Sequence, residues 1–173
     1  MDMLELIRTR RSIRRYKKEA VPEDLLEKIL EAGRWAPSAS NSQPWEFIIL
    51  RDRTIRGEVA KATTYGKFLA GAPLGIVVVI DPQASTHPVE DGAIATQNML
   101  LASHALGLGT CWIGAYGSVY EAAVSELLRI PKGKRVLSIL SIGYPAESPR
   151  SSRKELKEIT FTNWYGRRSE AKG

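Results

Sequence analysis

A cluster of basic residues near the start of the chain is its strongest chemical feature. Between positions 8 and 18 the cations have no acidic residue among them: Arg8, Arg10, Arg11, Arg14, Arg15, Lys17 and Lys18. Guanidinium groups bind phosphates and polarised carbonyls through paired hydrogen bonds. The cluster is either a solvated basic surface or the site of an anionic partner, namely nucleic acid, an anionic membrane or a phosphorylated small molecule.

Two further segments carry residues suited to holding a flat ligand. Residues 36–45 combine small side chains and amides between two prolines, which lets a backbone approach a ligand closely while offering hydrogen bonds. Residues 107–114 read Gly-Leu-Gly-Thr-Cys-Trp-Ile-Gly, where a long helix is expected to end and a strand to begin. A free thiol and an indole stand beside that turn.

Composition and length narrow the class of protein. The chain has 173 residues, 43% of them hydrophobic and 25% charged, which predicts one globular domain over residues 1–173. No apolar run reaches the roughly 20 residues of a membrane-spanning helix, and no apolar signal core follows the first basic residues. The single cysteine, Cys111, excludes an intramolecular disulfide and a zinc cluster. We therefore expect a cytoplasmic protein with no membrane partner and no metal.

Hydrophobic periodicity predicts an intermingled set of helices and strands. Residues 21–34 form an amphipathic helix with Pro22 at its first position, and residues 88–106 form the longest helix, which is apolar enough all round to be central or at a subunit interface. Shorter helices are expected at 1–8, 54–63 and 119–128, and strands at 46–50, 74–80, 110–114 and 136–143. Neither a regular βαβ alternation nor a glycine-rich nucleotide loop is present, so an α+β layered fold is favoured.

The motifs in this order resemble the FMN-dependent nitroreductase family. They are R-R-S-I-R-x-Y at 10–16, A-P-S-x-x-N-S-Q-P-W at 36–45, D-x-x-x-x-x-Q-N-x-L-L-A at 91–102 and G-L-G-T-C-W-I-G at 107–114, and the likeness runs over residues 4–153. The resemblance implies a nitroreductase-like α+β fold, with a central, mostly antiparallel sheet packed by helices. It also implies an intertwined homodimer, FMN at the subunit interface, and NADH or NADPH as the reductant.

The resemblance also assigns cofactor-binding residues, and no catalytic side chain or metal ligand. The first arginine segment would contact the flavin phosphate, ribityl chain and pyrimidine edge, the 36–45 segment would reach the flavin of the other subunit, and the turn near 113 would face the ring with backbone N–H groups. A late arginine would complete phosphate binding. The expected set is Arg10, Arg11, Ser12, Arg14, Pro37, Ser38, Ala39, Asn41, Ile113, Gly114 and Arg153.

The expected activity is ping-pong electron transfer from NADH or NADPH to a small oxidised acceptor such as a nitroaromatic or quinone. Alternatives within the resemblance are an FMN carrier or sensor, a flavin-dependent dehalogenase and a flavin-fragmenting enzyme. A nucleic-acid arm is disfavoured because no recognised nucleic-acid-binding motif accompanies the arginines. Residues 159–173 are expected to pack on the partner subunit. Tyr65 and Lys67 are only approximate candidates for flavin contact and are not part of the expected set, and Cys111 and His104 are expected to be structural.

Overall fold

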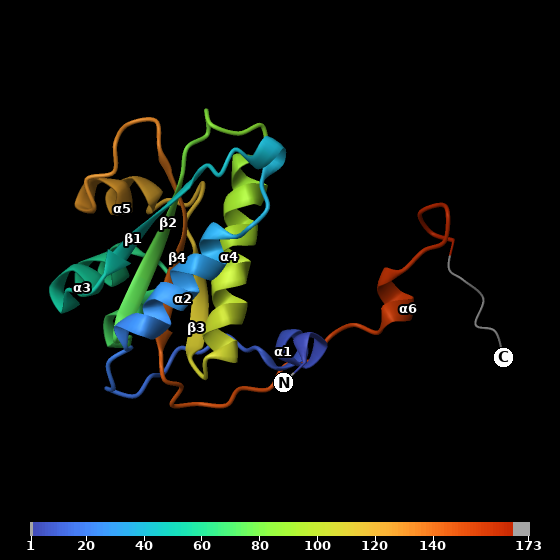
Figure 1. Cartoon of the computed structure of the whole chain (residues 1–173), viewed down its shortest axis with the longest axis horizontal. Coiled ribbons are helices and arrows are strands. Elements are labelled where there is room, and N and C mark those ends of the chain that lie inside the picture. The colour runs from blue at the N-terminus through green and yellow to red at the C-terminus, as the bar shows by residue number, and fades with distance from the viewer. Residues whose placement is uncertain (1, 168–173) are drawn as a thin grey trace.

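A four-stranded sheet lies between two layers of helices in the computed structural model, which describes residues 2–167 (Figure 1). Helices α2 (Glu23–Arg34) and α4 (Pro88–Ala105) cover one face. Helices α3 (Arg53–Ala62) and α5 (Glu121–Leu127) cover the other. Helices and sheet are thus layered, and the predicted α+β class is confirmed.

The sheet is antiparallel throughout, as the family resemblance implies. Its strands are β1 (Trp45–Leu50), β2 (Leu74–Ile80), β3 (Gly109–Gly114) and β4 (Arg135–Gly143), in the order β1-β2-β4-β3. All three pairings are antiparallel. Because β1 and β3 are the outer strands, each has one edge that does not pair with another strand of the sheet.

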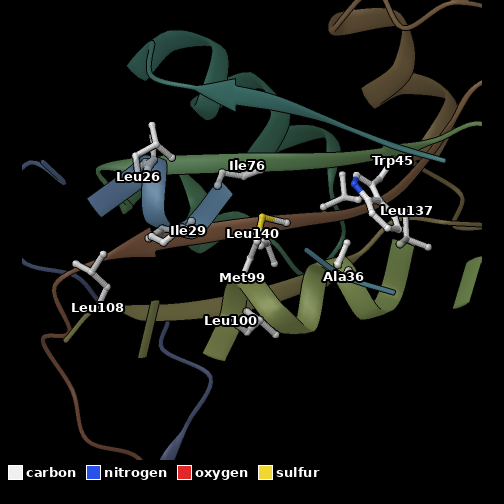
Figure 2. Close-up of a cluster of buried hydrophobic side chains, with 14 of the residues drawn as sticks. Leu26, Ile29, Ala36, Trp45, Ile76, Met99, Leu100, Leu108, Leu137 and Leu140 are labelled. Atoms are coloured by element: carbon white, nitrogen blue, oxygen red, sulfur yellow. The ribbon is translucent and has the colours of Figure 1, made fainter. Parts of the chain in front are cut away.

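The two central strands explain why the sheet is buried on both faces. Every residue of β2 is buried, with Ile76 and Val78 in the cluster beneath α2 and α4, and Val77 in the cluster beneath α3 and α5. Figure 2 shows the first cluster, where Met99 of α4 meets Leu140 of β4. This double burial accounts for a valine- and isoleucine-rich run without polar alternation.

Most predicted elements are confirmed, with differences at their ends. Pro22 is not the first helical residue as predicted but the N-cap of α2, because its backbone is extended at ψ 149°. The helix predicted over 119–128 begins only at Glu121, since Gly117 turns the chain with φ +68° just before it. The first helix, α1, spans Met3–Thr9 rather than residues 1–8, and Asp2 caps it.

Three short helices were missed by the periodicity. They are the 3₁₀ turns η1 (Ala39–Asn41) and η2 (Lys67–Gly71) and the four-residue α6 (Leu156–Ile159). Each is too short to show a helical repeat. After β4 the chain leaves the layered body, and α6 stands well away from it (Figure 1). No helix within residues 2–167 combines the length and apolar character that crossing a membrane requires.

Candidate functional site

The arginine segment runs along the outer edge of β3. Ser12 bridges Thr110 in parallel pairing, and the Ile13 amide donates to the Thr110 carbonyl at 2.8 Å. The Ile13 side chain is buried and packs on Gly109, where a Cβ would lie 2.7 Å from it. A strand edge and one buried isoleucine therefore hold the flanking arginines in place.

Two residues that were not predicted fasten the end of the segment. The Glu147 carboxylate accepts hydrogen bonds from the amides of Arg14 at 2.5 Å and Arg15 at 3.1 Å. The Tyr16 hydroxyl donates to the Ile13 carbonyl and pairs with the Ser141 hydroxyl at 2.6 Å. These bonds fix the backbone and leave the guanidinium of Arg14 exposed.

The predicted arginines meet in one cavity of about 280 Å³, named here the arginine cavity. Its lining brings Arg153, distant in sequence, to the first segment, together with two hydroxyl groups and a further arginine. The lining residues are Arg10, Arg11, Ser12, Arg14, Pro149, Arg150, Ser151 and Arg153. Within residues 2–167, none of the four predicted arginines forms an ion pair with a carboxylate. A polar hollow with this excess of positive charge suits a phosphate group.

A second cavity of about 310 Å³ lies on the other side of the same arginines, named here the His104 cavity. It shares Arg10 and Arg11 but also contains the Glu147 carboxylate and a largely apolar wall. A carboxylate repels phosphate, so the arginine cavity is the better phosphate site of the two.

Burial and the excess of positive charge both lower the pKa values of groups around these cavities. Burial lowers the pKa of Arg10, and the positive charges of Arg153 and Arg11 lower it further. Burial also lowers the pKa of His104, and the charges of Arg10 and Arg11 add to that effect. Both groups thus report an electrostatic environment that favours an anion.

The far end of β3 offers backbone donors next to the arginine segment. Alternate residues of a strand turn their N–H groups to opposite edges. Since the Thr110 carbonyl points outward to Ile13, the amides of Trp112 and Gly114 point to the same open edge. Ile113 pairs with Ile139 of β4, and its side chain is buried. The Gly114 amide therefore points to the open edge, and the flavin contacts of both Ile113 and Gly114 stay predictions.

The η2 region forms a wall beside this open edge. Gly66 packs on Ile113, where a Cβ would lie 2.9 Å from the isoleucine. The half-buried Phe68 ring lies 5.7 Å from the Arg14 guanidinium carbon. Tyr65 is 84% exposed, and the Lys67 ammonium donates to the Lys61 carbonyl instead of reaching the arginines. Phe68 was missed because a lone aromatic residue between short elements has no sequence signal.

Cys111 is placed near the arginines but is buried. Burial raises the pKa of its thiol, while Arg14, a hydrogen bond with Ser12 and Arg10 act in the opposite direction with smaller effects. A buried, protonated thiol is a poor nucleophile. The structural role expected for Cys111 accords with this environment.

The 36–45 segment lies at the opposite end of α4 from the arginines (Figure 1). There the Ala39 amide donates to the Asp91 carboxylate at 3.0 Å. At the other end of the helix, the His104 ring lies 2.9 Å from the hydroxyl of Thr9, next to Arg10. Thirteen residues of helix between Asp91 and His104 correspond to roughly 20 Å. A single chain therefore does not bring Pro37, Ser38, Ala39 and Asn41 to the arginine cavity.

That segment nevertheless has a defined shape. Ser40, Asn41 and Gln43 all adopt left-handed backbone conformations, with φ of 51°, 56° and 48°. The Ser38 hydroxyl accepts from the Gln43 amide at 2.9 Å, which holds the turn. Such conformations in non-glycine residues are uncommon, and they concentrate where a backbone is shaped for function.

Comparison with known proteins agrees with the sequence motifs. The family model described as the nitroreductase family matches residues 7–65 and 58–144. A Methanothermobacter thermautotrophicus protein, named for NADH dehydrogenase and NAD(P)H nitroreductase activity, is 42% identical over an alignment 153 residues long that covers 86% of this chain and 80% of that protein.

Two solved structures are also similar. The FMN-dependent nitroreductase of Clostridium difficile has a TM-score of 0.89 and 33% identity, over 94% of this chain and all of that chain (100%). A Desulfovibrio desulfuricans protein, described as a nitroreductase and solved in complex with FMN, has a TM-score of 0.82 and 37% identity, over 94% and 96% of the two chains. With motifs, fold and relatives in agreement, the chain belongs to the nitroreductase family.

Proposed function

We propose that this protein is an FMN-dependent oxidoreductase that passes electrons from NADH or NADPH to a small oxidised acceptor, such as a nitroaromatic or a quinone, by a ping-pong mechanism. The arginine cavity is the observation that carries the proposal. It gathers Arg10, Arg14 and Arg153 around a hollow without a carboxylate. FMN ends in a phosphate, and the proteins named above include FMN-dependent and FMN-bound members.

The residues present fit that cofactor. Arg10, Arg11 and Arg153 would hold the phosphate in the arginine cavity, with the Ser12 hydroxyl as a further hydrogen-bonding group. The open edge of β3 next to the cavity, with the outward Gly114 amide, would receive the ring. When bound, FMN supplies two-electron acceptance from a reduced nicotinamide and delivery to the acceptor, so no nucleophile or general acid is required of the protein.

Arg14 and Phe68 would influence the charge beside the flavin ring and the access of small molecules to it. The exposed Arg14 guanidinium places a fixed positive charge beside β3, where it favours the negative charge that reduction builds. Phe68 lies over the same guanidinium and closes one side of the space. A reductant and an acceptor would use the remaining open side in turn, which is the condition for a ping-pong mechanism.

We further propose that two copies of the chain complete each site. The arginine segment and the Pro37–Asn41 turn lie at opposite ends of α4, roughly 20 Å apart, so one chain would supply only part of the predicted contacts to each site. A two-fold dimer places the Pro37–Asn41 turn of one chain beside the arginine cavity of the other, and its symmetry creates two such sites.

The C-terminal tail supports the dimer. Leu156, Trp164 and Tyr165 are 75%, 65% and 94% exposed on a segment that stands away from the body (Figure 1). Large apolar side chains that are exposed together indicate a surface that packs on another molecule. Of the tail predicted to pack on the partner, residues 159–167 have this character, while 168–173 lie outside the described residues.

The other chain offers a matching surface at the open edge of β1. A hollow of about 610 Å³ there is lined by the apolar Leu30, Trp45, Phe47 and Ile49 and by the charged or polar Glu27, Glu31, Arg34 and Gln43. An unpaired strand edge beside apolar residues accepts an added segment of chain. We propose that this edge receives the tail of the partner.

The alternatives differ in what they require of the same site. A carrier or sensor would bind FMN without turning over, and a dehalogenase or flavin-fragmenting enzyme would need a different acceptor. The open side beside Phe68 and Tyr65 favours exchange of small molecules at the ring, which a carrier does not need.

Absorption spectroscopy and steady-state kinetics test the proposal together. Purified protein should show flavin bands, oxidise NADH or NADPH with a quinone or a nitroaromatic, and give parallel lines in double-reciprocal plots. If the protein binds flavin but reduces no acceptor that is tested, the result would favour the carrier or sensor alternative. Protein that takes up no added FMN would overturn the proposal altogether.

A further inference from the structure

A second basic cavity, of about 340 Å³, lies at the opposite end of the basic segment and shares no residue with the arginine cavity. Lys17 and Lys18 approach it from the segment, Arg53 and Arg56 from α3, and the chain before β2 closes it. Its lining residues are Lys17, Lys18, Arg53, Arg56, Ala70, Gly71, Ala72 and Pro73. The lining contains four cations and no carboxylate.

Arg56 is the observation that distinguishes this cavity from a chance group of surface cations. The side chain is only 6% exposed, and its Nη1 group donates to the carbonyls of Leu50 at 3.4 Å and Arg51 at 2.5 Å. Its Nε atom is buried and has no hydrogen-bond partner within residues 2–167. A buried, charged donor without an acceptor is costly, which favours an anion close to it.

The charges around Arg56 do not compensate it. Burial lowers the pKa of Arg56; the Asp52 carboxylate offsets part of this effect, and Arg53 adds to it. Asp52 is already engaged as the cap of α3, where it accepts from the Ile55 amide at 2.9 Å. Within the described part of the chain, none of the four lining cations forms an ion pair with a carboxylate.

The backbone holds the two lysines in position for the cavity. The Lys17 amide donates to the Tyr144 carbonyl at 2.9 Å, and Tyr16 bridges Pro145 just beyond the end of β4. Pro73 packs at the same end of β4, since a Cβ on Gly143 would lie 2.5 Å from the proline ring. The basic segment is therefore anchored twice, with Arg10–Arg14 at the β3 edge and Lys17–Lys18 at the end of β4.

We propose that this lysine–arginine cavity binds the phosphate group of a small phosphorylated molecule, in addition to the flavin phosphate. Four cations without a counter-charge favour a ligand with more than one negative charge, and a phosphate monoester carries about −1.5 to −2 at pH 7. The volume of the cavity suits a small molecule. The phosphate belongs either to free inorganic phosphate or to a nucleotide such as the reductant.

Inorganic phosphate is the direct probe, used on the FMN-loaded protein so that the arginine cavity is already filled. Calorimetric titration at constant ionic strength, with chloride in the reference, should show one saturable phosphate per chain. The double variant Lys17→Gln/Lys18→Gln and the single variant Arg53→Gln should each weaken phosphate binding about tenfold or more, because each removes charge-assisted hydrogen bonds. Arg56→Gln is a poorer test, because Arg56 also donates hydrogen bonds to two backbone carbonyls and its loss would disturb the local structure.

The matched control is Lys61→Gln/Lys132→Gln, which removes two exposed lysines outside the cavity and should leave phosphate binding unchanged. The FMN content of every variant should equal that of the wild type, which separates this site from the flavin assignment. Absence of saturable phosphate binding in the wild type would overturn the proposal. So would equal loss in the control and cavity variants.

NADP⁺ and NAD⁺ distinguish the two sources of the phosphate. If the cavity takes the extra phosphate of the reductant, Lys17→Gln/Lys18→Gln weakens NADP⁺ and leaves NAD⁺ unchanged. If it takes free phosphate, the variant weakens phosphate binding and leaves both nucleotides unchanged. Either result supports the cavity as a phosphate site.

Discussion

At the scale of single residues, the arginines of the cavity lie close together, and within residues 2–167 none of them forms an ion pair with a carboxylate. Glu147 could have paired with the guanidinium of Arg14, but its carboxylate accepts from the backbone amide of that residue instead. The Arg14 guanidinium is therefore available to interact with a ligand. His104 lies within the field of Arg10 and Arg11, so its titration reports whether that charge has been neutralised.

This coupling gives a prediction for FMN binding. Without flavin, burial and the two arginines hold the pKa of His104 below 6.5. A bound phosphate adds negative charge beside Arg10 and Arg11, which favours the protonated ring, so the pKa of His104 should rise on FMN binding. Proton NMR titration of apoprotein and holoprotein measures the shift, with His87→Gln used to assign the two histidine signals. An unchanged or lowered pKa of His104 would contradict the placement of the phosphate.

The sign of the stability effect follows from the same shift. In the apoprotein the unfolded chain binds a proton to His104 more readily than the folded chain does. The contribution of His104 to stability is therefore present above about pH 6.5 and is lost as the pH falls below that value. Because FMN binding should raise the pKa of His104, it should reduce this loss of stability at low pH.

At the scale of elements, the position of the arginine segment depends on its close packing against strand β3. Gly109 opens β3, and a Cβ there would lie 2.7 Å from Ile13. The buried Ile13 would have to move, and the arginines on either side would move with it.

The variant Gly109→Ala should therefore weaken FMN binding about tenfold and lower the free energy of unfolding by about 1–3 kcal/mol, through overpacking. Gly57→Ala is the matched control, since α3 leaves open space at that position and alanine favours helices. Fluorescence titration with FMN and chemical unfolding measure the two effects. Wild-type FMN affinity in Gly109→Ala would show that Ile13 does not position the arginines.

The sequence predicted α2 because its apolar residues repeat at the helical period, and it predicted β2 because of a short, uninterrupted run rich in valine and isoleucine. The sequence also identified the arginines, since their charge is evident without coordinates. It could not identify Glu147 or Phe68, which reach the site only through the fold and lie in segments without periodicity. The position of Pro37–Asn41 relative to the arginines likewise depends on the length of α4.

At the scale of the whole molecule, the proposed flavin contacts of one chain lie too far apart to form a single site. The arginine cavity lies near the end of α4 and the Pro37–Asn41 turn near its start, while the tail stands away from the body (Figure 1). The proposed dimer would account for all three features, because in it the tail of each chain covers the other and the turn of each completes the cavity of the other.

Complementation between two defective variants tests this arrangement. Arg10→Ala damages the cavity, and Asn41→Asp alters the turn while keeping a residue that tolerates the left-handed backbone. Each homodimer should retain little FMN. Random mixing after unfolding and refolding should restore about a quarter of the wild-type sites, since half of the dimers are mixed and each mixed dimer has one intact site. FMN retention equal to the mean of the two homodimers would mean that each site is built within one chain.

The central claim is that the arginine cavity binds the flavin through its phosphate, and a comparison of FMN with riboflavin tests it most directly. Apoprotein should bind FMN about a hundredfold more tightly than riboflavin, as expected for at least two charge-assisted hydrogen bonds. Arg10→Ala should remove most of that difference by weakening FMN alone, whereas Arg8→Ala, outside the cavity, should retain it. Equal affinity of the wild type for the two flavins, or an unchanged preference for FMN in Arg10→Ala, would contradict the account.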